Sequence, residues 1–348
     1  MRSGQKLALM LIVDAIAFIL ISLAILTNSF NWFNVHGTDE PVALATPVSQ
    51  SGDASDINIY ASAGDSVDAE TPDPNASANP TDGGEQGSSA TSTPEITGLC
   101  GNRFPDKFSY NGIIQTDTRY ASENIDIEVT YYEVEGVHYQ VADIYIQDIN
   151  CFKTWYDGEN KYHTYELAPQ VGAIVAVNGD MAINSSTRGW IVRNGLEYHN
   201  KELSEDICIL YWDGEMETYN YKTDTIDYDA IYARGPYQIW YFGPELLDDG
   251  QPMTSFNSSV NPKNPRTVVG YYEPGHYAFI VVEGKRDGGD SEGYSLVELS
   301  QLCYDLGLKV AYNLDGGGSA AMWYNNVTFA HDSRGTSDIL YIAEIPTA

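Results

Sequence analysis

The residues whose types and spacing best suit chemistry form the run Asn313-Leu314-Asp315-Gly316-Gly317-Gly318-Ser319, near the C-terminus. Three consecutive glycines mark a point where the backbone turns sharply or approaches a ligand closely. Successive N–H groups in such a turn can form a concavity that binds an anion. The carboxylate at its entrance is a candidate acid or base. The run predicts a phosphate site beside a catalytic group, although a turn with a structural aspartate would give the same residues.

A second polar segment, Asn178-Gly179-Asp180, follows an apolar run at residues 173–177. A continuous apolar run of this length is typical of a strand that is covered on both faces. Polar groups at the end of a buried strand are often directed into a site, whereas an Asn-Gly pair also forms ordinary turns. Asn178 and Asp180 are therefore candidate site residues.

Basic residues are few, and several stand at the ends of apolar runs. Arg266 opens one such run, where its guanidinium could hold a phosphate or carboxylate, or form a surface ion pair. Glu283 closes another run and is followed by Lys285 and Arg286. Positive charge placed in this way in an acidic chain indicates an anionic ligand.

The order of these segments resembles that of the phosphodiester glycosidases, from about residue 140 onward. The resemblance rests on Asn178-Gly179-Asp180, Gly189-Trp190-Ile191-Val192-Arg193-Asn194-Gly195, Pro265-Arg266-Thr267, Glu283-Gly284-Lys285, Ser291-Glu292-Gly293-Tyr294-Ser295-Leu296, the 313–319 run and Arg334-Gly335-Thr336-Ser337-Asp338. The 313–319 run with the helix expected before it is the specific part. Where the family usually has Asp-Gly-Arg, this chain has Glu283-Gly284-Lys285, so Arg286 is a candidate for the role of the family's arginine.

The resemblance implies hydrolysis of a glycosyl-1-phosphodiester at the anomeric carbon. It implies a catalytic pair, Asp315 and Glu283, that activates water or stabilises an oxocarbenium-like transition state. Arg266 and the glycine N–H groups would hold the phosphate, while Asn178 and Asp180 would hold sugar hydroxyls or a structural cation. The full set of implied substrate-binding residues is Arg266, Lys285, Arg286, Asn178, Asp180, Asn313, Gly316, Gly317, Gly318 and Ser319.

The elements that must position these residues are mostly strands. Alternating or continuous apolar patterns predict strands at 125–131, 138–146, 173–177, 207–212, 267–271 and 277–282. Ser295 and Glu298 form a capping-box pattern, and leucines at helical spacing predict a helix over 295–306. This helix leads into the strand before Asp315. The pattern predicts an α+β domain on a mixed or antiparallel sheet with few helices.

The N-terminal region is expected to anchor the chain in a membrane. Residues 7–27 are almost wholly apolar, and a helix of this length spans a bilayer core of about 30 Å. Arg2 and Lys6 precede it and acidic sequence follows, which places residues 1–6 in the cytoplasm and the C-terminal domain outside the cell. A cleaved signal peptide is the alternative, but the first A-x-A-like site, Ala43-Leu44-Ala45, lies far beyond the apolar end.

Residues 28–97 predict a disordered acidic linker, because they contain no Lys or Arg and too few large apolar residues to offset chain entropy. The catalytic domain is then expected at 98–348. A formal net charge of −31 argues against nucleic-acid binding, which requires a basic surface. An acidic, tyrosine-rich domain fits an extracellular protein that handles carbohydrate.

Cysteines and acidic residues give little sign of a metal site. None of Cys100, Cys151, Cys208 and Cys303 forms a C-x-x-C pair, so zinc is not predicted. Four cysteines outside the cell permit two disulfides in three pairings, with buried thiols as the alternative. No cofactor is predicted; residues 287–290 offer oxygen ligands for calcium but lack EF-hand spacing.

Two other functions remain open at this stage. The chain could be a non-catalytic glycan-binding module of the same fold, because a fold does not guarantee an activity. It could also be a structural envelope protein on a stalk, in which the 313–319 run is only a turn. The presence of both Asp315 and Arg266 favours the enzyme, a membrane-anchored extracellular hydrolase acting on surface or secreted glycans.

Overall fold

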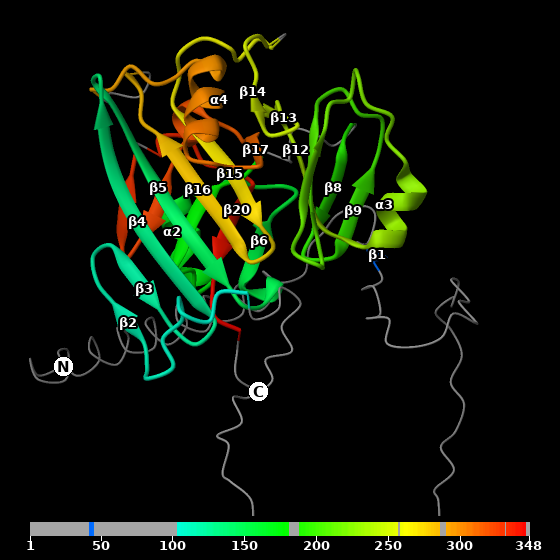
Figure 1. Cartoon of the computed structure of the whole chain (residues 1–348). Coiled ribbons are helices and arrows are strands. Elements are labelled where there is room, and N and C mark those ends of the chain that lie inside the picture. The colour runs from blue at the N-terminus through cyan, green and yellow to red at the C-terminus, as the bar shows by residue number, and fades with distance from the viewer. Residues whose placement is uncertain are drawn as a thin grey trace, which may run out of the picture. The chain divides into compact units, whose positions relative to one another are not determined.

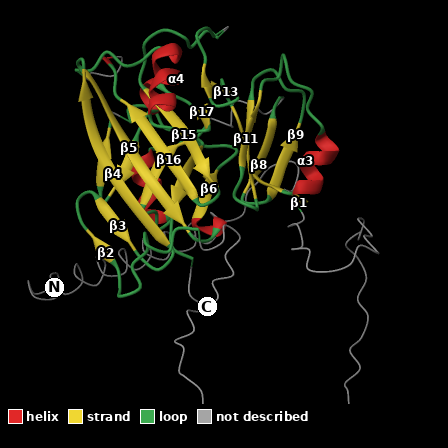
Figure 2. Cartoon of the chain, viewed as in Figure 1, coloured by secondary structure: helices red, strands yellow, loops and turns green. Residues whose placement is uncertain are grey.

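The structure, a computed structural model, describes residues 42–44, 103–180, 188–256, 258–285, 290–330 and 332–345. The predicted anchor at 7–27, nearly all of the linker, Cys100 and Arg286 lie outside these residues. No helix within them is long and apolar enough to span a membrane. Strands predominate in the described chain, with few helices (Figure 2).

The first sheet has seven strands and contains the long hairpin that the alternating sequence predicts. Its order is β17 (Val310–Asn313), β15 (Arg266–Glu273), β16 (His276–Val282), β5 (Val137–Ile146), β4 (Ile125–Val134), β3 (Arg119–Ala121) and β2 (Ile114–Gln115). Figure 1 shows β4, β5 and β16 lying side by side along this sheet. One of its faces packs against the second sheet.

The second sheet has five strands and brings the C-terminal part of the chain beside the predicted Asn178 segment. Its order is β19 (Val327–Phe329), β18 (Met322–Tyr324), β7 (Val175–Asn178), β20 (Asp338–Ile342) and β6 (Phe152–Tyr156), with the turn η1 (Ile149–Cys151) before β6. Buried side chains from both sheets form the main core, among them Ile127, Phe279 and Val177. The two sheets therefore face each other across a shared apolar layer.

A third sheet of six strands completes the described chain. Its order is β1 (Val42–Ala43), β9 (Leu196–Asn200), β8 (Trp190–Arg193), β12 (Pro236–Tyr241), β10 (Ile207–Tyr211) and β11 (Met216–Tyr219). The short hairpin of β13 (Leu247–Asp248) and β14 (Gln251–Pro252) follows β12. The pair β1–β9 corrects the prediction that residues 28–97 are disordered throughout, because the unpaired edge of β9 takes up Val42–Ala43 by backbone hydrogen bonding.

Three α-helices lie in the described part of the chain, one against each sheet. α4 (Leu296–Asp305) begins at the predicted cap, where Ser295 and Glu298 bond reciprocally, and buries Leu296 and Leu299 on the outer face of the seven-stranded sheet (Figure 1). α2 (Thr164–Gln170) packs on the five-stranded sheet. α3 (Tyr228–Arg234) packs on the six-stranded sheet through Ile231.

The predicted fold class is confirmed in its main features. Each of the six predicted strands is present, as β4, β5, β7, β10, β15 and β16, and the predicted helix is α4. All pairings between the described strands are antiparallel, so the mixed-sheet alternative is wrong. Several of these pairs, such as β4–β5, β15–β16 and β18–β19, are joined by short hairpins, which only antiparallel strands permit.

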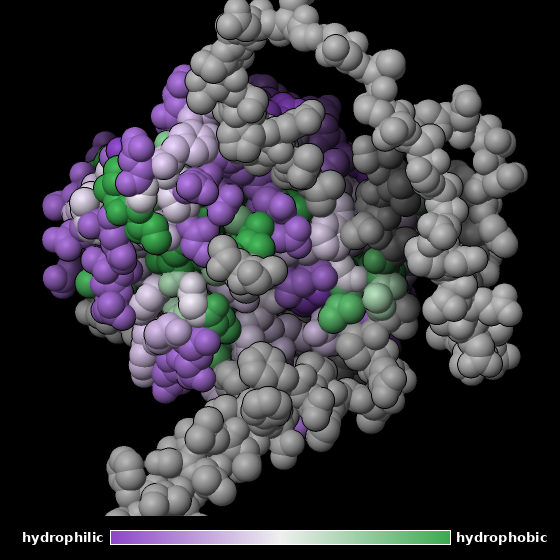
Figure 3. All heavy atoms as spheres, turned by 90° about the horizontal axis from the view of Figure 1, so that it is seen from below, coloured by the Kyte–Doolittle hydropathy of each residue, from purple (hydrophilic) through white to green (hydrophobic). Residues whose placement is uncertain are grey.

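The cysteines that the structure describes lie in the interior of the fold. Cys208 and Cys303 are buried free thiols, so two disulfides do not form. Burial raises the pKa of Cys303, which keeps this thiol protonated and unreactive. On the face seen in Figure 3, hydrophobic patches are separated by hydrophilic residues.

The stability of the fold should depend on pH through Glu245. This residue lies between β12 and β13 and forms an isolated β-bridge with Tyr312 of β17. Burial, aided by the negative charge of Asp206, raises its pKa to about 7 against the bond donated by Asn220. The folded state then binds more protons than the unfolded chain between about pH 4.5 and 7, so the free energy of unfolding falls as pH rises through this window. We expect Glu245→Gln to remove that slope and to add about 2 kcal/mol at pH 8, measured by urea unfolding. The exposed Glu133→Gln is the control, and an unchanged slope in Glu245→Gln would contradict the assignment.

Candidate active site

The 313–319 run crosses from the first sheet to the second. Leu314 still pairs with β15, since its N–H donates to the carbonyl of Thr267 at 2.9 Å. The next N–H, that of Asp315, donates to the carbonyl of Gly179 at the end of β7, at 3.1 Å. Gly316 then passes so close to β15 that a Cβ would lie 2.5 Å from the carbonyl oxygen of Pro265, which explains the need for glycine there. Asp315 is thereby fixed where the two sheets meet.

The carboxylate of Asp315 is 4% exposed and is held by one arginine. Nη2 of Arg334 lies 3.0 and 2.8 Å from its two oxygens, and the N–H of Gly316 donates to it at 2.9 Å. Burial raises the pKa of Asp315, while Arg334, Ser319 and the Gly316 N–H oppose that shift. The group is a desolvated carboxylate with a specific charge partner, which is the environment of many catalytic acids and bases.

Arg334 lies in the family-like segment 334–338 and is a candidate site residue that the residue pattern alone did not predict. Its Nε donates to the hydroxyl of Ser319 at 3.0 Å, and its Nη2 also donates to the carbonyl of Gly316 at 2.9 Å. The side chain is 48% exposed, and Nη1 makes no hydrogen bond within the described part of the chain. This nitrogen can bind an anion beside Asp315. The signal in the sequence was an arginine 15 residues after Ser319 in a segment resembling the family motif.

The glycine N–H groups are less available than the sequence predicts. That of Gly316 donates to Asp315, and that of Gly317 donates to the carbonyl of Pro265 at 3.1 Å. Among the three glycines, only the Gly318 N–H makes no hydrogen bond in the described residues. The expected concavity of three donors is therefore wrong, because the turn uses two of them to hold its own shape. Ser319 is buried against Arg334 and supports the same turn.

Asn178 connects three elements beneath Asp315. Its Nδ2 donates to the carbonyl of Asp315 at 2.7 Å, and its Oδ1 accepts from the hydroxyl of Thr267 at 2.6 Å and from the N–H of Ala321 at 3.2 Å. The side chain is fully buried. The structure does not support a direct contact of Asn178 with substrate, because its Nδ2 and Oδ1 both form hydrogen bonds within the protein. We assign Asn178 to the positioning of Asp315.

Asp180 belongs to a buried charge cluster. Nη2 of Arg193 lies 2.8 Å from Oδ1 of Asp180 and 3.2 Å from Oδ2 of Asp338, and all three side chains are fully buried. Burial and the neighbouring Asp180 raise the pKa of Asp338 well above its ordinary value, against the opposing effect of Arg193. Gly179 fits only because it lacks a Cβ, which would lie 2.1 Å from Asp338. The cluster fixes the segment that bonds to Asp315, and no sugar contact of Asp180 is supported.

Glu283 follows β16 on the face turned towards the second sheet. Alternation along the strand places it on the same face as Val281 in the main core. Its Oε2 lies 2.9 Å from Nδ1 of His138 on the neighbouring β5. Gly284 packs on Pro265, where a Cβ would lie 2.7 Å from Cδ of the proline. Since β15 separates β16 from β17, the backbones of Glu283 and Asp315 are roughly two strand spacings, about 10 Å, apart.

The remaining predicted residues take supporting positions. Arg266 is buried, so the surface ion pair is excluded; its Nη2 donates to the carbonyls of Val260 and Pro262 at 2.6 Å, and burial lowers its pKa to about 10. Lys285 is exposed and pairs with Glu292 at 3.2 Å. Asn313 donates to the carbonyl of Gly243 at 2.8 Å. Phosphate binding by Arg266 and Lys285 therefore stays a prediction without a contact to support it.

Comparison with known proteins identifies the family of the chain. Residues 171–343 match the family model described as phosphodiester glycosidase. The chain belongs to the phosphodiester glycosidase family. The match begins at the end of α2 and includes Asp315, Glu283 and Arg334. The family assignment supports a hydrolase of the phosphodiester glycosidase type, while no curated protein sequence matches the chain.

Three solved structures are similar to this chain at low sequence identity. The catalytic domain of zebrafish N-acetylglucosamine-1-phosphodiester alpha-N-acetylglucosaminidase, auto-inhibited by its pro-peptide, is 19% identical over 64% of this chain and 83% of its own, with a TM-score of 0.49. A hypothetical protein from Synechocystis is 12% identical over 64% of this chain and 62% of its own, with a TM-score of 0.46. A putative exported protein from Burkholderia pseudomallei is 12% identical over 60% and 74%, with a TM-score of 0.39.

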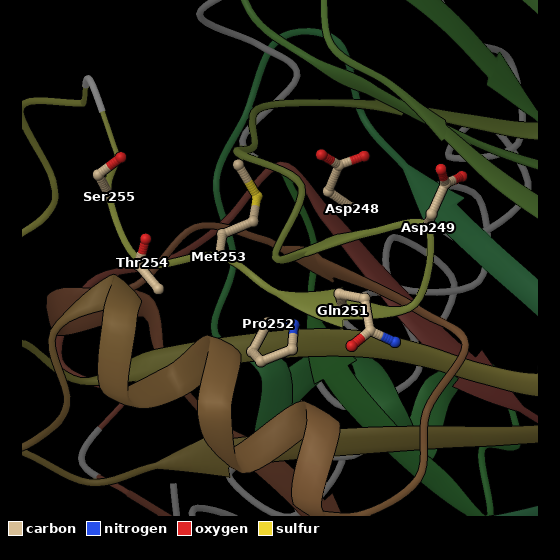
Figure 4. A pocket seen from close by; sticks show the side chains of 7 residues that line it. All are labelled: Asp248, Asp249, Gln251, Pro252, Met253, Thr254 and Ser255. Atoms are coloured by element: carbon tan, nitrogen blue, oxygen red, sulfur yellow. The ribbon is translucent and has the colours of Figure 1, made fainter.

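The family domain also has a surface pocket of about 460 Å³ that is separate from Asp315. Figure 4 shows its lining side chains on the β13–β14 hairpin and the segment that follows it, beside α4: Asp248, Asp249, Gln251, Pro252, Met253, Thr254 and Ser255. None of these is basic, and two carboxylates would repel a phosphate. Asp315 with Arg334 is therefore the better candidate site for a phosphodiester. No group of metal-ligating side chains occurs among the described residues.

Proposed function

We propose that the chain hydrolyses glycosyl-1-phosphodiesters, such as those of N-acetylglucosamine, in surface or secreted glycans. The observation that carries this proposal is the buried carboxylate of Asp315 held by Arg334, whose Nη1 has no protein partner in the described chain. A desolvated carboxylate beside an exposed cation suits a substrate that combines a sugar with a phosphate. Membership of the family supports the same reaction class.

The reaction follows from the charges at the site. The phosphodiester oxygen leaves C1 of the sugar with the bonding electron pair, and Arg334 with the Gly318 N–H stabilises its negative charge. The oxygen of water bonds to C1, and its proton passes to Asp315 or Glu283. The products are a free sugar and a phosphomonoester. Because phosphate leaves readily once its charge is held, the site needs no strong general acid.

The location of the reaction is part of the proposal. Residues 7–27 have the length and flanking charges of a membrane anchor with the C-terminal domain outside the cell. We therefore propose that the glycosidase acts at the outer surface of the membrane. Protease accessibility of the C-terminal domain on intact cells is the test of that orientation.

The direct test is hydrolysis by the full-length chain in detergent. The substrates are UDP-N-acetylglucosamine and methyl phosphodiesters of N-acetylglucosamine, glucose and mannose, followed by proton and phosphorus NMR. We expect release of a free sugar and a phosphomonoester. Arg334→Ala should lower kcat/KM about 100-fold, since removing one charge-stabilising donor has effects of this size. The control is Arg103→Ala, whose side chain is equally exposed and pairs with Glu273.

The outcomes separate the candidate functions. Sugar release that is lost in Arg334→Ala and kept in Arg103→Ala supports the hydrolase. Binding of sugars without turnover would instead support a glycan-binding module of the same fold. Neither binding nor turnover by the folded protein would contradict the proposal and favour a structural envelope protein.

A further inference from the structure

Two aromatic side chains from opposite sheets meet beside Glu283. Tyr131 lies on β4 of the seven-stranded sheet and is 50% exposed. Phe329 lies at the end of β19 in the five-stranded sheet. Their ring centroids are 6.0 Å apart with an interplanar angle of 78°, an edge-to-face contact. The two rings therefore connect the facing sheets at a point that solvent reaches.

His138 links this aromatic pair to the candidate catalytic carboxylate. Its ring centroid lies 5.9 Å from that of Tyr131, and its Nδ1 lies 2.9 Å from Oε2 of Glu283. Burial and the charges of Glu133 and Glu283 raise the pKa of Tyr131, which places its hydroxyl within the field of Glu283. The order Tyr131, His138, Glu283 runs across β4, β5 and β16 on one face of the sheet.

Phe329 lies close along the chain to the other half of the site. The β18–β19 hairpin follows the Gly317–Ser319 turn, with Met322 paired to Phe329. Five residues after Phe329, Arg334 returns to bond Asp315. On one sheet the aromatic pair therefore lies beside His138 and Glu283, and on the other Phe329 lies in the chain segment between the Asp315 turn and Arg334.

This combination suits one kind of ligand. A pyranose ring has an apolar face of C–H groups, which packs on aromatic rings, and a rim of hydroxyls, which bond to carboxylates and imidazoles. Cross-strand packing alone explains the contact of Tyr131 with His138, but it does not require half of a large aromatic side chain to stay in solvent. The exposed Tyr304 on α4 has no carboxylate–histidine pair beside it that the structure shows. Exposed Tyr165 on α2 does stack on His163, which pairs with Asp332, but neither of these two residues belongs to the candidate catalytic pair.

We propose that Tyr131 and Phe329 form a stacking subsite for the pyranose ring of the substrate, next to Glu283. The inference rests on the proposed function in that it assigns the sugar half of the substrate to this place and the phosphate half to Arg334. The rings supply affinity, and His138 fixes the orientation of Glu283 towards the bound sugar. Tyr131 is a binding residue here, with no part in proton transfer.

The test compares Tyr131→Ala, Tyr131→Phe and the control Tyr304→Ala in the full-length chain. In hydrolysis of a sugar-1-phosphodiester, Tyr131→Ala should raise KM about tenfold, which corresponds to about 1.4 kcal/mol of lost stacking, with kcat within about twofold of wild type. Tyr131→Phe keeps the ring and should retain the wild-type KM. Tyr304→Ala should change neither constant. An unchanged KM in Tyr131→Ala, or an equal rise in Tyr131→Phe, would overturn the subsite.

A second readout does not depend on activity. Binding of N-acetylglucosamine, glucose, mannose and galactose is measured by saturation-transfer NMR, with melting temperatures to confirm folding. Sugar binding that is lost in Tyr131→Ala and kept in Tyr304→Ala supports the subsite even if no phosphodiester is hydrolysed, in which case the proposed function alone fails. If sugar binding is the same in Tyr131→Ala as in wild type, or if the folded wild type binds no sugar, the subsite is overturned, whatever the hydrolysis assay shows.

Discussion

Asp315→Asn is expected to lower kcat for sugar-1-phosphodiester hydrolysis by about 1,000-fold or more. Asparagine has the same shape, so the bonds that hold the 313–319 run are largely kept, but it cannot accept a proton from water or stabilise a cationic sugar. It also leaves Arg334 without its charged partner at 2.8 Å. The measurement is steady-state turnover of the best substrate, with circular dichroism to confirm the fold.

The matched control is Asp305→Asn at the exposed end of α4, which should keep wild-type turnover. Retention of more than a tenth of the activity in Asp315→Asn would show that this carboxylate is not catalytic. The pH profile gives a further check. Because burial raises the pKa of Asp315 and the ionised form is required, kcat/KM should fall on the acid side at a higher pH than an ordinary aspartate would give.

Arg193→Met is expected to destabilise the fold by about 3–5 kcal/mol, or to prevent folding. The substitution preserves the apolar stem but leaves the buried carboxylates of Asp180 and Asp338 without their cation. Removing one partner from a buried ion pair exposes the full desolvation penalty of the other. Urea unfolding measures the loss.

Two comparisons test this explanation. Arg234→Met breaks an ion-pair network with Asp213, Glu215 and Glu217 that lies at the surface, and it should have a much smaller effect. Adding Asp180→Asn to Arg193→Met should recover part of the stability, because it removes the unpaired charge. Equal losses in Arg193→Met and Arg234→Met would mean that burial of the cluster does not matter.

The cluster and the catalytic turn form one structural unit. The N–H of Gly179 donates to the carbonyl of Asp338, and its carbonyl accepts from the N–H of Asp315. The segments that carry the family motifs are therefore linked by backbone bonds and do not all contact substrate. In this unit Asn178 and Arg193 position the turn, whereas Asp315 and Arg334 are the residues that we propose to contact the substrate.

The sequence by itself determined those elements whose periodicity and local signals are strong. The capping box at Ser295 fixed the start of α4, because it depends only on residues three apart. Alternation fixed the hairpin of β4 and β5, because side-chain direction in a strand follows from neighbouring residues. The glycine run marked the turn at Asp315. Short strands such as β8, β12 and β20 have continuous buried patterns that only their neighbours explain.

The tertiary structure alone decided which polar groups are available for chemistry. Arg266, Asn178 and Asp180 are the right residue types for a phosphate and sugar site, yet their partners come from segments that are distant in sequence and are brought together by the sheets. Arg334 reached Asp315 in the same way, across 19 residues. Local sequence specifies backbone direction and donor type, whereas hydrogen-bond partners and desolvation depend on contacts between sheets. For this reason the sequence located the turn at Asp315, and only the fold showed which cation holds its carboxylate.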